Sequence, residues 1–350
     1  MPSLGESVAR LAAFRAGRSG AVGPERLVRL ADFGSNPGEL EAFCHVPARL
    51  GSGAPLVVVL HGCTQTAAEY DAGSGWSALA ERAGFAVLYA EQRRANNPNV
   101  CFNWFVPDDV RRGSGEVASI AQMVSAMQGL HGLEPRRTFV TGLSAGGAMA
   151  MAMLATYPER FAAGAVLAGV PFGAAGTVQD ALERMRGKGL PGAERLADAV
   201  RRASPHEGPW PRLSVWQGTS DMRVDAANAE AIAASWAMLH GASAAPQEGV
   251  NGHHRRVWSD ASGREVVEAF SITGMGHGLP LSEYGAEAWG RAGPHMLEAG
   301  ISSTRRIAAF WGLAPPLQDS VSDPARASAP AGNGAEFFIN QALRQAGLLR

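Results

Sequence analysis

Cysteine is scarce in this sequence, which has only three cysteines among 350 residues. Three cysteines are too few for a disulfide-rich scaffold, and they are too widely spaced for a cysteine-ligated metal knuckle. Buried free thiols are the first interpretation of Cys44, Cys63 and Cys101. A bridge between Cys63 and Cys101 stays open as the alternative, because both belong to loops beside the predicted functional site.

Strong net charge and long apolar runs are also lacking. The formal net charge is -1 and the sequence pI is about 6.8, so the chain has no basic footprint for nucleic acid. No run reaches the ~18 apolar residues of a membrane span, and residues 1–23 lack the roughly 7–15-residue apolar core of a secretory signal. We therefore expect small or neutral partners and a cytoplasmic location, with secretion open if a leader has been removed.

Motifs for cofactors and metals are missing as well. The glycine-rich stretch from Gly142 to Gly147 lacks the Gly-Lys-Ser/Thr ending of a phosphate-binding loop. No histidine and glutamate pair stands at the helical spacing of a zinc site. The sequence thus predicts neither a cofactor nor a metal.

Buried strands alternate with helices along the chain, which has 46% hydrophobic residues. This alternation predicts an α/β fold with a doubly wound, mostly parallel sheet. Residues 27–31 and 40–46 should form an antiparallel hairpin at one edge of that sheet. Continuous apolar runs predict buried strands at residues 56–60, 85–90, 163–168 and 213–217. Helices are expected at residues 76–83, 116–131, 228–240 and 302–311.

The domain organisation follows from this pattern. Residues 1–26 form an N-terminal extension and residues 27–313 the main domain, in which residues 171–211, with two helical segments, form a cap or lid. Residues 314–334 are rich in Pro, Ala, Ser and Gly and read as a linker. Residues 335–350 predict a C-terminal helix. Docking of this helix onto the main domain is favoured over contact with a partner or granule surface.

Ser144 stands at a tight turn between an apolar run rich in β-forming residues and an Ala/Met-rich helical run. A Gly-x-Ser-x-Gly turn in this context is typical of a nucleophile elbow. Side chains two residues on either side of the serine would collide, so Gly142 and Gly146 free the backbone for the strained conformation. Ser144 is the candidate nucleophile, and an incidental serine in a glycine-rich connection is the alternative.

A serine nucleophile needs a general base, and the base needs a carboxylate that holds its tautomer. His277 is the best base, because it lies in a glycine-rich loop directly after an apolar strand; His253 and His254 are expected in a solvated polar turn. Asp221 is the best carboxylate, as the first acid after the strand at residues 213–217. Asp225 is its rival, but should cap the following helix.

Two backbone N–H groups are expected to form an oxyanion hole, those of Cys63 and Ala145. Because this role belongs to amides, Cys63→Pro should abolish activity, whereas Cys63→Ala should be tolerated unless a disulfide matters. His61 is expected as a buried loop anchor at the edge of the substrate pocket. An aromatic loop contains Asn103, Trp104 and Phe105. This loop is expected either to form a wall of the substrate pocket or to pack in the core, and the sequence favours neither role over the other.

With these residues in hand, the sequence resembles the polyhydroxybutyrate (PHB) depolymerase family of esterases, within the α/β-hydrolase superfamily. The resemblance covers residues 27–313. It rests chiefly on the His-Gly-Cys-Thr-Gln run from His61 and the Cys-Phe-Asn-Trp-Phe run from Cys101, and it includes Gly276 and His277. Many relatives carry Ala-Trp after the histidine, whereas Gly278 follows here. No separate polymer-binding domain is visible, which argues against attack on crystalline polymer.

This resemblance implies a serine esterase that hydrolyses poly- or oligo-3-hydroxyalkanoate esters through an acyl-enzyme. Feruloyl or acetyl-xylan esters of plant polysaccharides are the alternative substrates. A serine peptidase on the same fold is an alternative activity. From another class, a catalytically silent granule-binding protein is also considered. The intact series of Ser144, Asp221 and His277 argues against that alternative.

Overall fold

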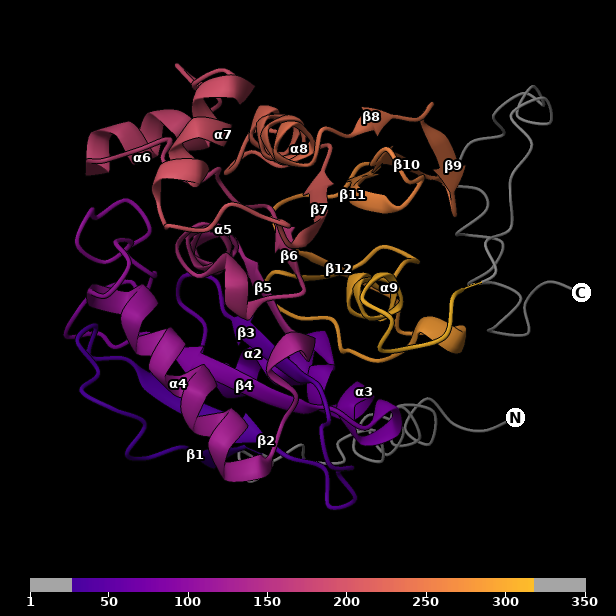
Figure 1. The fold of residues 1–350 in the computed structure, drawn as a ribbon. Helices are drawn as coiled ribbons and strands as arrows, with labels where there is room; N and C mark the ends of the chain where they lie inside the picture. The colour runs from indigo at the N-terminus through magenta and orange to yellow at the C-terminus, as the bar shows by residue number, and fades with distance from the viewer. Residues whose placement is uncertain (1–26, 318–350) are drawn as a thin grey trace, which may run out of the picture.

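A computed structural model describes residues 27–317, so the predicted N-terminal extension, most of the linker and the C-terminal helix lie outside it. An eleven-stranded sheet runs through the described part, in the order β1-β2-β4-β3-β5-β6-β7-β11-β10-β8, with β9 paired to β10 (Figure 1). Strands β4, β3, β5, β6, β7 and β11 are parallel neighbours. The sequence-based prediction of a doubly wound, mostly parallel sheet is therefore confirmed.

Antiparallel pairs close both edges of this sheet. At one edge β1 pairs with β2, and β2 with β4, as the predicted hairpin requires. At the other edge β10 pairs with β11, β8 and β9. The strands of the large sheet are β1 (Val28–Arg29), β2 (Glu41–His45), β3 (Leu56–Leu60), β4 (Ala86–Glu91), β5 (Thr138–Leu143), β6 (Ala163–Leu167), β7 (Arg212–Gly218), β8 (Ser243–Ala244), β9 (Glu248–Val250), β10 (His253–Ser259) and β11 (Glu265–Ile272).

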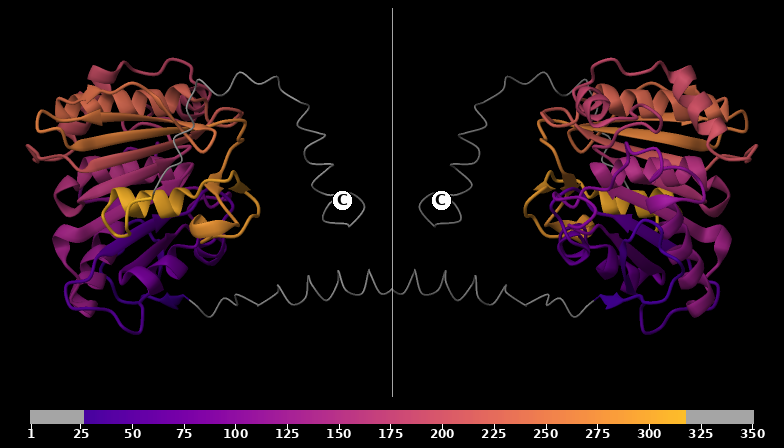
Figure 2. Two further views of the ribbon diagram at one scale, coloured as in Figure 1. Left: turned by 90° about the vertical axis from the view of Figure 1, so that its right-hand side faces the viewer. Right: turned by 90° about the vertical axis from the view of Figure 1, so that its left-hand side faces the viewer.

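Helices cover both faces of the sheet (Figure 1). Helices α4, α5 and α8 lie on one face, whereas α3 and α9 lie on the other, onto which the left view of Figure 2 looks. The helices are α2 (Ala67–Ser74), α3 (Trp76–Ala83), α4 (Gly115–His131), α5 (Ala145–Thr156), α6 (Val178–Met185), α7 (Ala193–Arg202), α8 (Ala227–His240) and α9 (Ser303–Phe310).

The core is divided by the sheet into two apolar layers. Side chains alternate between the faces of a strand, so Val58 packs in the layer under α4, α5 and α8 while Val57 and Val59 pack under α3 and α9. All five residues of β3 are buried. Burying each such side chain contributes about 1.5–3 kcal/mol, and this explains the continuous apolar runs that predicted the parallel strands.

Several elements were not predicted from the sequence, among them helix α2 and the short strands β8, β9, β12 (Leu279–Leu281) and β13 (Met296–Glu298). Helix α2 begins after Thr66, whose hydroxyl accepts the Glu69 amide at 3.2 Å while the Glu69 carboxylate accepts the Thr66 amide at 2.9 Å. This reciprocal capping box satisfies two backbone donors at the helix start. A small parallel pair of strands, β12 and β13, follows the large sheet.

The segment between β6 and β7 contains the two helices expected in residues 171–211. Helix α6 and helix α7 match the predicted helical segments at residues 178–186 and 193–202. Helix α7 packs beside α8, and both lie at the top of Figure 1. A lid movement of this segment stays a prediction.

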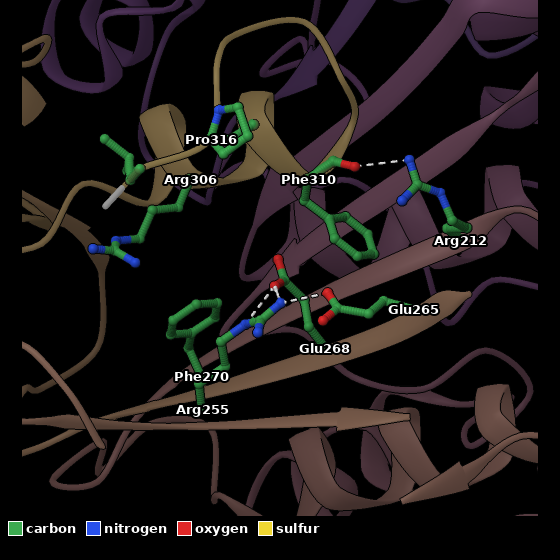
Figure 3. A pocket seen from close by; sticks show the side chains of 10 residues that line it. Arg212, Arg255, Glu265, Glu268, Phe270, Arg306, Phe310 and Pro316 are labelled. Carbon is green, nitrogen blue, oxygen red and sulfur yellow. Dashed lines mark hydrogen bonds and ion pairs between the residues drawn. The ribbon is translucent and has the colours of Figure 1, made fainter. Parts of the chain in front are cut away.

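A cavity of about 320 Å³ lies toward the amino ends of β7 and β11, beside α9. Within it, the Arg255 guanidinium bonds to the Glu268 carboxylate at 2.9 Å and to the Glu265 carboxylate at 2.7 Å (Figure 3). Glu268 also accepts the Ser214 hydroxyl at 2.7 Å. Burial raises the pKa of Glu268, and Arg255 opposes that rise. None of the predicted site residues lines this cavity.

Candidate active site

Ser144 sits in the turn between β5 and α5, with φ 56° and ψ -117°. Such a conformation is unfavourable for a residue with a side chain and persists only where the surroundings impose it. A Cβ added at Gly142 would overlap the backbone of Gly146, and one added at Gly146 would overlap the carbonyl groups of Leu60 and His61. The glycines on either side of Ser144 therefore allow the elbow to press against β3.

A chain of hydrogen bonds joins the three predicted site residues. The Nε2 atom of His277 lies 2.9 Å from the Ser144 hydroxyl, and its Nδ1 atom lies 2.7 Å from the Asp221 carboxylate. Ser144 follows β5, Asp221 follows β7 and His277 follows β11. All three strands are parallel, so their carboxyl ends bring these loops to the same edge of the sheet.

The Asp221 carboxylate is fully buried, with 0% of its side chain exposed. One oxygen accepts the backbone amides of Arg223 and Val224 at 2.8 and 2.9 Å, and the other accepts the Gln217 side-chain amide at 3.0 Å besides His277. Burial alone would raise the pKa of Asp221, but the hydrogen bonds from His277 and the two amides outweigh it and lower the pKa. Asp221 is therefore held as a carboxylate that orients the imidazole.

The residues that competed with Asp221 and His277 in the sequence analysis take no part in these hydrogen bonds. Asp225 accepts the amide of Ala227 at 2.9 Å just before α8, although the N-cap position itself belongs to Ala226. The prediction that His253 lies in a solvated turn is wrong, because His253 begins β10 and is buried between the Ala299 carbonyl and the Thr273 amide. His254 is exposed on the same strand.

Two backbone amides beside Ser144 are unpaired. Within residues 27–317, neither the Cys63 N–H nor the Ala145 N–H donates to a protein acceptor. Ala145 is the first residue of α5, where the helix dipole favours negative charge, and Cys63 follows β3. Because neither amide has a protein acceptor, both donors are available to an oxygen atom that binds next to the Ser144 hydroxyl.

A disulfide joins Cys63 to Cys101, with the two Cα atoms 4.2 Å apart. The first interpretation of these two residues as buried free thiols is therefore wrong, and the alternative that was left open is correct. Only Cys44, in β2, is a buried free thiol. The bridge ties the loop carrying the Cys63 amide to the loop with the aromatic residues 102–105, because the parallel sheet places both loops at one edge.

His61 is the buried anchor that the sequence predicted. Its Nε2 atom accepts the Gln92 amide at 3.0 Å, so its Nδ1 atom donates to the Gly62 carbonyl at 2.7 Å. Burial lowers the pKa of His61 to about 4, so it stays neutral. His61 lines neither of the two cavities that contain Ser144, which have volumes of about 380 and 220 Å³, so its position does not support its assignment to the substrate pocket.

The aromatic loop divides between the two roles that the sequence left open. Trp104 and Phe105 line a cavity beside Ser144, whereas Phe102 is fully buried in the core. Asn103 lines neither of the two cavities beside Ser144 but braces the loop, since its backbone amide donates to the Glu116 carboxylate at 2.9 Å. Burial, with a contribution from Asp109, raises the pKa of Glu116 to about 8.

The larger cavity at Ser144 has a volume of about 380 Å³ and carries no charged side chain among its lining residues. Helix α6 forms one wall, the aromatic loop forms the other, and Ser144 and Ala145 lie at its base. An apolar cavity of this size fits an aliphatic or aromatic acyl group. Its α6 wall consists of Val178, Ala181, Leu182 and Met185.

A second cavity of about 220 Å³ is also lined by Ser144. His277 lines this cavity but not the larger one, and Arg223 and His295 lie on its wall. A neighbouring cavity of about 350 Å³ shares Thr64, Gln65 and His295 with it. Ser144 therefore lines both an uncharged cavity and a groove that contains the charged side chain of Arg223.

Comparisons with known proteins identify the family. The family described as "Esterase PHB depolymerase" matches residues 43–257, and a "Poly(3-hydroxyalkanoate) depolymerase C" of Paucimonas lemoignei is 43% identical over 295 residues. That match spans 82% of this chain and 70% of the relative. The chain belongs to the PHB depolymerase family of esterases. It is a carboxylic ester hydrolase with the α/β-hydrolase fold, as the resemblance implied.

Other relatives of the esterase are named for a different substrate. An "Acetylxylan esterase" of Coprinopsis cinerea is 34% identical over 264 residues, covering 73% of this chain and 70% of the relative. Among solved structures, an acetyl xylan esterase from Aspergillus awamori superposes with a TM-score of 0.70 at 25% identity, over 82% of this chain and 99% of that one. The similarity extends through both groups of esterases.

Three features of the esterase's site were missed by sequence reasoning. The apolar stripe of α6 recurs at the spacing i, i+3, i+4 and i+7, and that signal could have identified the cavity wall. No comparable signal marks Arg223 or His295, because loop residues reach a cavity only through the tertiary arrangement.

Within residues 27–317, no helix is long and apolar enough to cross a bilayer, and no His/Cys/Asp/Glu group is arranged to hold a metal ion.

Proposed function

We propose that this esterase hydrolyses poly- or oligo-3-hydroxyalkanoate esters, hydroxybutyrate esters above all, with Ser144 as nucleophile. The hydrogen-bonded chain from Asp221 through His277 to Ser144, beside two unpaired amides, is the observation that carries the mechanism. The named activity of the 43% identical relative, together with an uncharged cavity next to the serine, supports the substrate class.

Acylation begins when His277 Nε2 takes the proton of the Ser144 hydroxyl and the oxygen attacks the ester carbonyl. Asp221 holds the proton on Nδ1 and stabilises the imidazolium that forms. The carbonyl oxygen, now negative, accepts hydrogen bonds from the amides of Cys63 and Ala145, and each such donor contributes about 10²–10³ in rate. The imidazolium then gives its proton to the leaving alkoxide, which departs as the alcohol.

Deacylation repeats these steps with water. His277 removes a proton from the water, the hydroxide oxygen attacks the acyl carbon, and the same two amides hold the oxyanion. Collapse of this intermediate breaks the bond to Ser144, whose oxygen regains the proton from His277. A free carboxylic acid leaves the apolar cavity, and the enzyme returns to its starting state.

The second candidate function is that of an acetylxylan or feruloyl esterase, which the acetylxylan relatives favour. An acetyl group would fill only part of the apolar cavity of about 380 Å³. We therefore prefer 3-hydroxyalkanoate esters to acetyl esters as substrates. A cytoplasmic location is a further part of this proposal, and a granule contact through residues 335–350 stays the less favoured alternative to docking on the main domain. Both come from the sequence alone.

A panel of substrates separates these functions. The enzyme should release 3-hydroxybutyrate from its dimer and trimer with a kcat/KM at least about tenfold above acetate release from acetylated xylan, a difference worth ~1.4 kcal/mol. Methyl ferulate and an amide analogue of the dimer serve as comparisons. Faster release of acetate or ferulate would replace the hydroxyalkanoate assignment, and release of amine would indicate a peptidase.

The disulfide should matter both for the fold and for the oxyanion donors. Bridging residues 38 positions apart restricts the unfolded chain, so Cys63→Ala/Cys101→Ala should lose about 4 kcal/mol. That loss lowers Tm by about 5–10 °C. With the Cys63 loop no longer tied, we expect kcat on p-nitrophenyl butyrate to fall about tenfold, a part of what one donor contributes.

Thermal melting and steady-state kinetics of the purified double variant check this. Cys44→Ala is the matched control, because it removes a buried thiol that takes part in no bridge. An unchanged Tm together with an unchanged kcat in the double variant would show that the bridge supports neither the fold nor the site.

A further inference from the structure

The groove next to His277 contains one permanently charged side chain, that of Arg223. This residue lines the cavity of about 220 Å³ together with Ser144 and His277. Within residues 27–317 the Arg223 guanidinium has no hydrogen-bond or ion-pair partner, and the residue is exposed. The neighbouring carboxylate of Asp221 is fully buried and engaged by His277, so it does not neutralise the arginine.

The position of His277 distinguishes the two sides of the reacting ester. In acyl transfer the imidazole must deliver its proton to the leaving oxygen, so the leaving alcohol lies on the side of His277. His277 lines the groove with Arg223 and does not line the apolar cavity under α6. The acyl group therefore fills the apolar cavity, and the leaving alcohol enters the groove of Arg223.

The leaving group of a 3-hydroxyalkanoate ester carries an acid at its far end. When the scissile ester joins the last unit of an oligomer, the leaving molecule is a 3-hydroxy acid whose carboxylate is separated from the carbinol carbon by a single methylene. A guanidinium matches a carboxylate with two parallel N–H donors. In the interior of a polymer the same position holds a neutral ester, which offers no charge to Arg223.

We propose that Arg223 binds the free carboxylate of the leaving unit, so that the esterase cleaves short, soluble oligomers from their carboxyl end. This inference rests on the proposed hydroxyalkanoate function. Arg223 acts here as a specificity-determining residue. Its backbone amide, which donates to Asp221 at 2.8 Å, is retained in Arg223→Gln and Arg223→Lys, so the triad geometry does not depend on the guanidinium.

Two forms of the hydroxybutyrate dimer test the proposal, the free acid and its methyl ester, which differ only in the carboxylate. For the unsubstituted enzyme, kcat/KM on the acid should exceed that on the methyl ester. In Arg223→Gln the acid-to-ester ratio of kcat/KM should fall about tenfold, mostly through KM, because a charge-assisted hydrogen bond is lost at an exposed position. Arg223→Lys should restore part of the ratio. Added salt should lower the ratio of the unsubstituted enzyme, since screening weakens an exposed charge pair.

The matched control is Arg264→Gln, which removes another exposed arginine just before β11, at the end of the strand opposite to His277. Its ratio should equal that of the unsubstituted enzyme. Equal ratios in Arg223→Gln and the unsubstituted enzyme would overturn the role of Arg223 while leaving the proposed function intact. If neither dimer is hydrolysed although p-nitrophenyl butyrate is, the hydroxyalkanoate function itself fails, and the inference fails with it.

Discussion

Replacing Ser144 with alanine should lower kcat/KM on p-nitrophenyl butyrate by about 10⁴–10⁶-fold. Without the hydroxyl there is no oxygen to attack the carbonyl and no acyl-enzyme, so only the amides of Cys63 and Ala145 and the binding cavities are left to act on the substrate. The fold should be unaffected, because alanine tolerates the φ of 56° at this position no worse than serine does.

Steady-state kinetics on the purified Ser144→Ala variant, with thermal melting as the test of folding, measure this effect. Ser52→Ala is the matched control, since Ser52 is exposed in a turn before β3, and its activity should stay within about twofold. Turnover by Ser144→Ala at the unsubstituted rate would refute the serine mechanism and would favour a direct attack by water.

The second large effect is expected from Asp221→Asn, with a loss in kcat of about 10³–10⁴ at neutral pH. The asparagine keeps the shape of the side chain but can turn an N–H₂ group toward His277, which then no longer holds its proton on Nδ1. The imidazole would present a proton instead of a lone pair to Ser144. KM should change little, because Asp221 is fully buried and lines neither cavity beside Ser144.

Asp225→Asn provides the control, as the neighbouring acid whose carboxylate accepts the Ala227 amide. We expect it to keep kcat within about fivefold. A larger loss in Asp225→Asn than in Asp221→Asn would reverse the assignment of the carboxylate.

The charge of Asp221 also determines how its contribution to folding stability depends on pH. The folded-state pKa of Asp221 lies below its ordinary value, so the stability that its ionised form contributes is present above the unfolded-state pKa of about 3.9. That contribution is lost as the pH falls through the lower, folded-state pKa. At neutral pH the carboxylate is therefore fully ionised in the enzyme.

Much of the fold was predictable because its signals are local. A run such as Leu56–Leu60 must be buried on both faces, and the structure places it in the parallel sheet with every residue buried. Helix α2 was missed because its apolar positions form no clear stripe, although the capping box of Thr66 and Glu69 is a local signal that could have marked its start. His253 was misjudged for a related reason, since its burial comes from packing beside Ala299, far away along the chain.

The location of the elbow at Ser144 was predictable from the sequence alone. The order of strand, Gly-x-Ser-x-Gly turn and helix follows from side-chain period and from sterics within a few residues, whereas the strained φ of Ser144 also depends on packing against β3. The placement of Asp221 and His277 directly after strands was predictable in the same way.

Tertiary structure decided how these parts meet. Ser144 and His277 are 133 residues apart, and the order of the parallel strands brings them into hydrogen-bond distance. That order also joins Cys63 to Cys101, leaves two amides unpaired beside the serine, and puts Arg223 on the wall of the groove. Such contacts depend on pairing between strands that are distant in the chain, which the pattern of any single segment does not encode.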